Sequence, residues 1–288
     1  MRRWLRVPRA LADDRARRTT DVVTLPLVVE ARLAPGVRRV DLVVTVDNTA
    51  RDHRLRLLFP TGAPTDACRA ATTFGVATRS TAPRDDAGWV HRAPRTFAHQ
   101  GWVETNGLGV VAAGLPEAEV GSDGTIAITL VRAVGWLARY DLRSRPIPAG
   151  PPMETPAAQC PGPLVARLSL VAGADSRTMR DAELGLRGVI GGADPRLADG
   201  ASLLAVEPAA IVVTAVKAAE DGVGVVVRLL NPTDAPIDAR LRLGFAVRTA
   251  GAVRLDETPV AEAVEIDADL VRVAVPARAL RTVRLVPA

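Results

Sequence analysis

The sequence has 288 residues, of which 48% are hydrophobic, enough to bury a core in one large or two ordinary domains. No stretch approaches the ~18 uncharged apolar residues of a membrane helix, and no apolar run follows the arginine-rich start, so we expect neither a membrane span nor a secretory signal. The formal net charge is +5, but the arginines are scattered among acids rather than gathered beside aromatic residues, which argues against nucleic acid as a partner.

The two cysteines, Cys68 and Cys160, are too few and too far apart in sequence to form a disulfide framework. We expect each of them to be a reduced, buried thiol, since free cysteine is among the residues most often buried. Reduced thiols are typical of the cytoplasm, which is the location that we expect.

Apolar residues alternate with polar ones along most of the chain, as in strands that bury one face. In residues 40–46 and 241–247, apolar side chains stand at every second position. The same reasoning predicts further strands at residues 55–59, 108–112, 125–130, 164–171, 211–216, 224–230, 271–275 and 282–286.

Turn signals separate these strands. The dipeptides Pro35-Gly36, Asp123-Gly124 and Asp221-Gly222 supply the positive φ angles that tight reversals need. Only residues 176–186 have the length and composition of a short helix, and their glycines limit it. The chain is therefore predicted to be all-β, a meander of short strands in a sandwich architecture.

The strand pattern breaks once, at residues 191–200, where glycine, aspartate and proline are concentrated. A new set of strands begins at about Leu203. We therefore expect a first domain at residues 1–202, which is large for one sandwich, and a second at residues 203–288, which has the size of a small immunoglobulin-like sandwich.

Five segments, in order, resemble the C-terminal region of glycoside hydrolase family 38 α-mannosidases. They are VDLVVTVDNTARDHRLRLLFPTG (residues 40–62), GLGVVAAGLPEAEV (107–120), ITLVRAVGWLARYDLRSRP (128–146), AGPPMETPAAQCPG (149–162) and VVVRLLNPTDAPIDARL (225–241). One departure is Ala118, where the family commonly has tyrosine, and it puts in doubt any contact that this tyrosine would make.

The resemblance implies a large β-sandwich of the supersandwich, galactose-mutarotase-like type, followed by a small terminal β-sandwich. Family 38 enzymes are retaining hydrolases whose single zinc ion is held by His and Asp residues of an N-terminal α/β domain. We expect that catalytic domain to be absent from this chain, so neither catalytic residues nor zinc ligands can be assigned here. Zinc is expected in the missing domain, and the chain alone is expected to be inactive.

Other chemical candidates have structural alternatives. Glu117 and Glu119 would share one face of a strand, but a glycosidase pair normally flanks its substrate from separate elements, so a solvated strand face explains them better. The three histidines, His53, His91 and His99, lack the close spacing of a zinc site, and we expect no metal in this chain.

Two arginines, Arg132 and Arg228, interrupt apolar strands and are our candidates for the rim of a substrate site. A guanidinium at such a position must either be paired or face a cleft. A structural ion pair is the alternative for each of them, and it is the better supported of the two.

The sequence therefore supports a C-terminal, non-catalytic portion of an α-mannosidase-type hydrolase that assists mannoside hydrolysis and carbohydrate binding in the complete enzyme. The expected partners are mannosides and either a separately encoded catalytic domain or a second copy of the chain. An apolar docking surface is expected around residues 97–103 and 129–136. The alternative is a free-standing carbohydrate-binding or interaction module, for which the candidate sugar platforms are Trp89, Trp102, Trp136 and Tyr140, although core placement explains each aromatic better.

Overall fold

The computed structural model describes residues 1–142, 147, 149–173, 176–186, 188–190 and 200–288. The chain divides into two compact units. Unit 1 consists of Met1–Ala71 and Ala77–Ala174, and unit 2 of Thr72–Val76 and Asp175–Ala288. The boundary expected at residues 191–203 falls mostly outside the described residues and stays a prediction.

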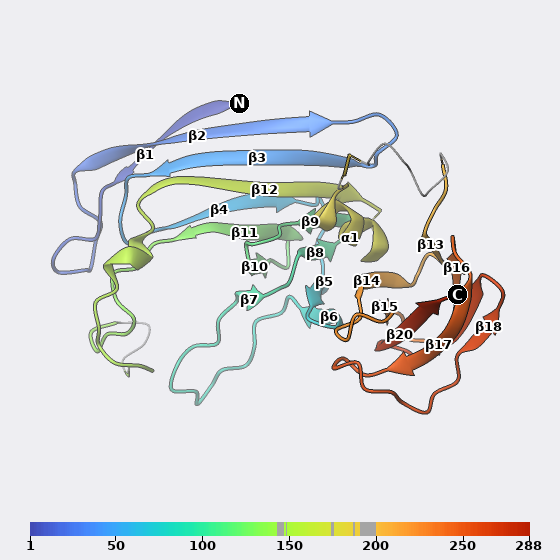
Figure 1. Ribbon diagram of the computed structural model, residues 1–288. Helices are drawn as coiled ribbons and strands as arrows, with labels where there is room; N and C mark the ends of the chain where they lie inside the picture. The colour runs from blue at the N-terminus through green and yellow to red at the C-terminus, as the bar shows by residue number, and fades with distance from the viewer. Residues whose placement is uncertain (143–146, 148, 174–175, 187, 191–199) are drawn as a thin grey trace. The chain divides into compact units, whose positions relative to one another are not determined.

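Unit 1 contains two antiparallel sheets, in which the long strands β2, β3 and β12 run side by side (Figure 1). The larger sheet has the order β1-β2-β3-β12-β9-β8-β5-β6 and the smaller one β4-β11-β10-β7. The strands are β1 (Arg2–Pro8), β2 (Val22–Leu33), β3 (Arg39–Asn48), β4 (Arg54–Pro60), β5 (Ala67–Thr72), β6 (Gly75–Ser80), β7 (Phe97–Ala98), β8 (Trp102–Thr105), β9 (Leu108–Val111), β10 (Glu117–Val120), β11 (Thr125–Arg132) and β12 (Gly162–Ala172).

The core of unit 1 forms because the alternating apolar residues of both sheets point toward each other. Val44 and Val46 of β3 are fully buried, as are Ile126 and Ile128 of β11, and all four belong to one hydrophobic cluster. Burial of one such side chain contributes roughly 1.5–3 kcal/mol, so this cluster supplies most of the driving force for the sandwich.

Unit 2 is a smaller sandwich of two four-stranded antiparallel sheets, with the orders β13-β16-β19-β18 and β14-β15-β20-β17. Leu229, Leu241 and Leu285 are fully buried in its core. Its elements are helix α1 (Ser176–Leu184) and the strands β13 (Leu204–Glu207), β14 (Val212–Ala218), β15 (Val225–Asn231), β16 (Ile237–Leu243), β17 (Val247–Val253), β18 (Glu265–Asp267), β19 (Leu270–Val275) and β20 (Ala279–Pro287).

The expected fold class, a large β-sandwich followed by a small one, is confirmed, and helix is confined to α1 and a short 3-10 helix, Pro156–Gln159, among the described residues. The three predicted turn glycines, Gly36, Gly124 and Gly222, all have positive φ. No helix in the described part of the chain is long and apolar enough to cross a membrane.

One predicted strand is wrong. The alternation at residues 241–247 indicates a continuous strand, but β16 ends at Leu243 and β17 begins only at Val247. Gly244 stands at the break, where a Cβ would lie 2.3 Å from the carbonyl oxygen of Ser202. This close backbone approach accepts only glycine.

Candidate functional site

Three segments that are far apart in sequence line one pocket of about 570 Å³ in unit 1. Asp52 follows β3, Trp136 follows β11, and Gln159 ends the 3-10 helix Pro156–Gln159. Each comes from one of the segments that resemble family 38, residues 40–62, 128–146 and 149–162. We call this hollow the Trp136 pocket.

Asn48, at the end of β3, joins two of these segments by hydrogen bonds. Its side chain is buried, and its Nδ2 donates to the carbonyl oxygens of Gln159, at 3.0 Å, and Cys160, at 2.9 Å. Its Oδ1 accepts from the backbone N–H of Ala50 and lies 2.8 Å from Nε2 of His53. A buried amide with all these partners fixes the turn after β3 against the 3-10 helix.

Gln159 holds Asp52 by two hydrogen bonds. Its Nε2 donates to Oδ1 of Asp52 at 2.7 Å, and its Oε1 accepts from the backbone N–H of Asp52 at 2.8 Å. Asp52 has a φ of 53°, a left-handed conformation that few non-glycine residues adopt. The Gln159 side chain is only 6% exposed, so this strained turn is held by a buried partner.

Gly135 leaves the space that this pair occupies. A Cβ at this position would lie 2.9 Å from Nε2 of Gln159 and 3.6 Å from Oδ1 of Asp52. A larger residue would therefore press on the hydrogen bonds between the two side chains.

One wall of the pocket is a stack of Trp136 and Arg139, and Asp141, which lies outside the lining, holds the arginine. The Arg139 guanidinium lies 4.4 Å from the centroid of the Trp136 ring and donates to both carboxylate oxygens of Asp141, at 2.8 and 2.9 Å. The hydrogen bonds to Asp141 raise the pKa of Arg139, with a smaller contribution from Asp52. The Trp136–Arg139 stack is therefore preorganised, with the charge of Arg139 paired to Asp141.

Arg18 supports the pocket from the N-terminal segment. Its guanidinium donates to the backbone carbonyls of Pro8, Arg51 and Asp52. Burial lowers the pKa of the neighbouring His53, and the charge of Arg18 lowers it further, while Asp52 opposes the shift. The lowered pKa favours the neutral imidazole, whose Nε2–H can donate to Oδ1 of Asn48.

The charges that line the pocket balance. Arg15, Arg51 and Arg139 contribute three positive charges, and Asp13, Asp52 and Glu154 contribute three negative ones. Such a lining offers both donors and acceptors without favouring an ion of either sign, which suits a neutral polyhydroxyl ligand.

Arg132, one of the two rim candidates, does not line the Trp136 pocket. It lines a separate hollow of about 410 Å³ together with Phe97 and Glu117, and its guanidinium lies 3.8 Å from a carboxylate oxygen of Glu117. Glu117 is also paired with Arg54 at 2.9 Å. The assignment of Arg132 to a substrate rim stays a prediction.

Glu117 and Glu119 do share one face of β10, as the spacing indicates, and both are half-buried. Glu119 is paired with Arg56 at 2.7 Å. Each carboxylate therefore has an arginine partner, as in a solvated strand face.

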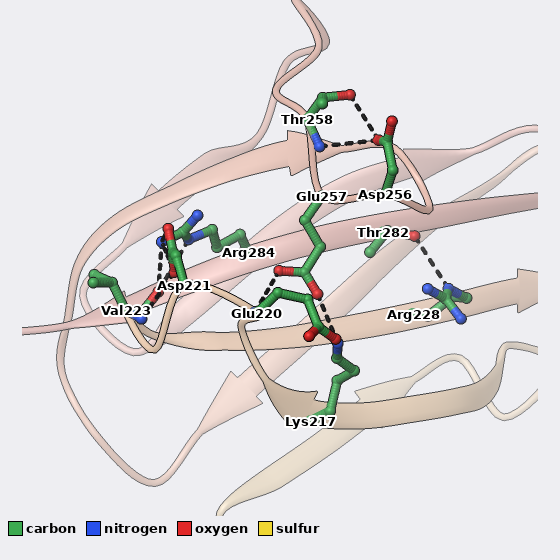
Figure 2. A network of polar contacts seen from close by, with 10 residues as sticks. All are labelled: Lys217, Glu220, Asp221, Val223, Arg228, Asp256, Glu257, Thr258, Thr282 and Arg284. Carbon is green, nitrogen blue, oxygen red and sulfur yellow. Dashed lines mark hydrogen bonds and ion pairs between the residues drawn. The ribbon is translucent and has the colours of Figure 1, made fainter.

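Arg228, the other rim candidate, lies in unit 2 (Figure 2). Its Nε donates to Oγ1 of Thr282 across β15 and β20 at 3.4 Å, and it forms no ion pair within the described part of the chain. The nearby network is structural: Lys217 pairs with Glu220 and Glu257, and Arg284 pairs with Asp221. The structure thus places Arg132 and Arg228 in different units, and the role of Arg228 at a substrate rim stays a prediction.

The expected burial of the aromatics and cysteines is only partly right. Trp102 and Cys68 are buried, as expected, and burial raises the pKa of the Cys68 thiol to about 11. Trp89 and Tyr140 are exposed and Trp136 is half-buried. Cys160 is exposed because it follows the 3-10 helix in a left-handed turn, with φ 49°.

The apolar docking surface expected at residues 97–103 and 129–136 stays a prediction, since Val134 is exposed and Phe97 and Trp136 are half-buried, while the other large apolar side chains are buried. Trp102, Val103, Leu130 and Val131 are all buried in unit 1. These four residues belong to β8 and β11, and the side chains on both faces of these two strands are mostly buried.

A zinc ion does not fit the residues that the structure describes, because no three of their His, Cys, Asp and Glu side chains gather as ligands. Two of the three histidines are also committed elsewhere. His53 is bonded to Asn48, and His99 is enclosed in the core region of unit 1.

Sequence comparison finds a family match within unit 2 and a curated relative over about half of the chain. Residues 210–283 match the model of the glycosyl hydrolases family 38 C-terminal beta sandwich domain. A putative mannosylglycerate hydrolase of Halalkalibacterium halodurans is 34% identical over 156 residues, which cover 52% of this chain and 16% of that protein.

Structural comparison gives the same result over nearly the whole chain. An α-mannosidase from Enterococcus faecalis has a TM-score of 0.80 and 25% identity over 98% of this chain. A protein in glycosyl hydrolase family 38 from Enterococcus faecalis has a TM-score of 0.78 and 25% identity, also over 98% of this chain. The match spans 33% and 34% of those two chains, so this chain covers about a third of their length.

Proposed function

We propose that this chain, which is similar to the C-terminal portion of family 38 α-mannosidases, supports mannoside hydrolysis in a complete enzyme and binds carbohydrate in the Trp136 pocket. The observation that carries the proposal is the convergence of Asp52, Trp136 and Gln159 on one pocket. These residues come from three segments and are each more than twenty residues apart in the sequence. Two hydrogen bonds hold Asp52 and Gln159 together.

The chemistry of the pocket suits a sugar. Carbohydrate sites combine an aromatic or apolar wall with a few fixed polar groups that set the orientation of the ligand. Here the wall is the Trp136–Arg139 stack, and the fixed polar group is the Asp52–Gln159 pair. The name of the curated relative makes mannosylglycerate a glycoside worth testing beside simple α-mannosides.

In the complete enzyme the partner would be a catalytic domain, supplied on the same or a separate polypeptide, and it would hold the zinc ion and the nucleophile. Self-association of the chain is the other partner arrangement that we propose to test. The cytoplasmic location stays a prediction.

We predict that methyl α-D-mannopyranoside shifts the indole N–H signal of Trp136 in a ¹H–¹⁵N NMR titration, in a saturable manner. The reason is that the ring forms part of the pocket wall, whereas Trp102 is buried and Trp4 and Trp89 lie away from the pocket lining. Trp136→Ala should abolish the binding, and Trp89→Ala is the matched control that should retain it.

The opposite result has a clear meaning. Binding that survives Trp136→Ala but is lost in Trp89→Ala would favour a free-standing binding module that uses its exposed aromatic side chain. No saturable shift in any indole signal would contradict the proposed carbohydrate site.

We also predict that the purified chain does not hydrolyse an activated aryl α-mannoside, with or without added zinc. The described residues offer no ligand set for the metal, and the two carboxylates of β10, Glu117 and Glu119, are each paired with an arginine. Turnover that persists after a second chromatographic step and in a preparation from a mannosidase-deficient host would show that the non-catalytic role is wrong.

A further inference from the structure

Asp52 is the one carboxylate of the Trp136 pocket that the fold holds in place. Gln159 binds its Oδ1 and its backbone N–H, and Arg18 binds its backbone carbonyl. Asp13 and Glu154, the other two acids of the lining, are exposed, and neither carboxylate has a hydrogen bond within the described part of the chain, although the backbone of Glu154 forms an isolated β-bridge with Trp136.

The second carboxylate oxygen of Asp52, Oδ2, has no hydrogen-bond partner within the described residues, although Asp52 is half-buried and lines the pocket. A fixed carboxylate with a free oxygen can receive hydrogen bonds from hydroxyl groups, and hydrogen bonds to a charged acceptor are about twice as strong as neutral ones. Because the acceptor is already oriented, little conformational entropy is lost when a ligand binds.

We propose that Asp52 accepts hydrogen bonds from the ring hydroxyls of the bound pyranoside, and that Gln159 is its positioning residue. This inference rests on the proposed function, since it names the group that recognises the sugar in the same pocket. The ligand class is a neutral pyranoside, because the three arginines and three acids of the lining balance each other.

Gly135 completes the arrangement. Its missing side chain leaves Gln159 free to reach Asp52, since a Cβ would lie 2.9 Å from the Gln159 amide nitrogen. Gly135 has no positive φ, so its replacement by alanine changes the space around the pair rather than the backbone conformation.

The test compares the binding of methyl α-D-mannopyranoside with that of its 2-, 3-, 4- and 6-deoxy analogues, by NMR titration of the full chain. The wild type should bind at least one deoxy analogue about tenfold more weakly than the parent sugar, the loss expected for one charge-assisted hydrogen bond. In Asp52→Asn, which keeps the shape but replaces the charged acceptor by a neutral amide, only a neutral hydrogen bond to the hydroxyl remains possible, and this ratio should fall to about threefold or less.

Two further variants separate positioning from general damage. Gln159→Met and Gly135→Ala should lower the same affinity ratio, because a misplaced carboxylate no longer discriminates the hydroxyl. A merely structural role would weaken the parent sugar and the analogue equally and leave the ratio unchanged. Gly251→Ala, where a Cβ meets nothing within 4 Å, is the control that should keep the wild-type ratio.

The outcomes are distinct for the two proposals. If the wild type binds the mannoside and Asp52→Asn keeps the wild-type discrimination against the deoxy analogue, the role of Asp52 is overturned while the carbohydrate site stands. An unchanged ratio in both Gln159→Met and Gly135→Ala would overturn the positioning role of Gln159. Wild-type protein that binds none of the sugars would overturn the proposed function and this inference together.

Discussion

Replacing Asn231 by alanine is expected to lower the free energy of unfolding of unit 2 by about 3–5 kcal/mol. Asn231 ends β15 and is fully buried. Its Nδ2 donates to the carbonyls of Ala235, Val275 and Pro276, and its Oδ1 accepts from both the N–H and the hydroxyl of Thr233. Alanine would remove the partner of the buried Val275 carbonyl and of several partly buried groups at once, and each buried group left unpaired costs about 1–3 kcal/mol.

Urea unfolding of the full chain, followed by circular dichroism, measures this effect. Thr233→Ala is the control, because it removes only the hydroxyl at the half-exposed end of the same network, and it should cost about 1 kcal/mol or less. A loss below about 1 kcal/mol in Asn231→Ala would show that the turn between β15 and β16 does not depend on this amide.

The second large effect concerns His99. The imidazole is 3% exposed, and neither ring nitrogen has a hydrogen-bond partner among the residues that the structure describes. Burial lowers its pKa to about 4 from 6.5, while the nearby backbone of Leu115 opposes the shift. In the unfolded chain the ring takes up a proton as the pH falls below about 6.5, but in the folded chain it does so only near pH 4. The unfolded state is therefore favoured progressively between these two values.

This single group is expected to remove about 3 kcal/mol of stability between pH 7 and pH 4. His99→Leu should remove that part of the pH dependence, because it has no proton to bind and no hydrogen bond of the ring is lost. The measurement is the free energy of unfolding of both proteins at several pH values, so that the carboxylates common to both cancel. Parallel pH curves for the two proteins would contradict the assignment.

The strands that could be predicted from the sequence are those with one apolar face, such as β3 and β12, where alternation follows directly from burial. The long strand β2 was not among them. It contains Pro26 near its middle and presents apolar side chains, including Val22 and Val28, on the less buried side as well, so that its alternation is blurred. The first strand, β1, has four charged or exposed residues among its first five and lies at the edge of the sheet.

The site was harder to predict than the fold. Asp52 and Gln159 are 107 residues apart, and only the packing of the 3-10 helix against the turn after β3 brings them together. Periodicity carries no information about such a contact. All three segments resemble family 38, but a resemblance in sequence does not indicate that they meet in space. Arg132 and Arg228, the two rim candidates, do not line the Trp136 pocket.

In both units a buried asparagine at the end of a strand fixes the turn that follows. Asn48 at the end of β3 and Asn231 at the end of β15 are both buried and both bond to distant backbone carbonyls. In unit 1 this arrangement also carries Gln159 to the pocket, so a residue that stabilises the fold also determines the geometry of the candidate site.

The central claim is that the Trp136 pocket is the carbohydrate site, and a crystal structure of the chain soaked with methyl α-D-mannopyranoside tests it most directly. We expect the sugar in the pocket, with a ring hydroxyl within hydrogen-bond distance of Oδ2 of Asp52 and contact with the wall formed by Trp136 and Arg139. A sugar bound at Trp89 or elsewhere on the surface, with the Trp136 pocket empty, would contradict the account.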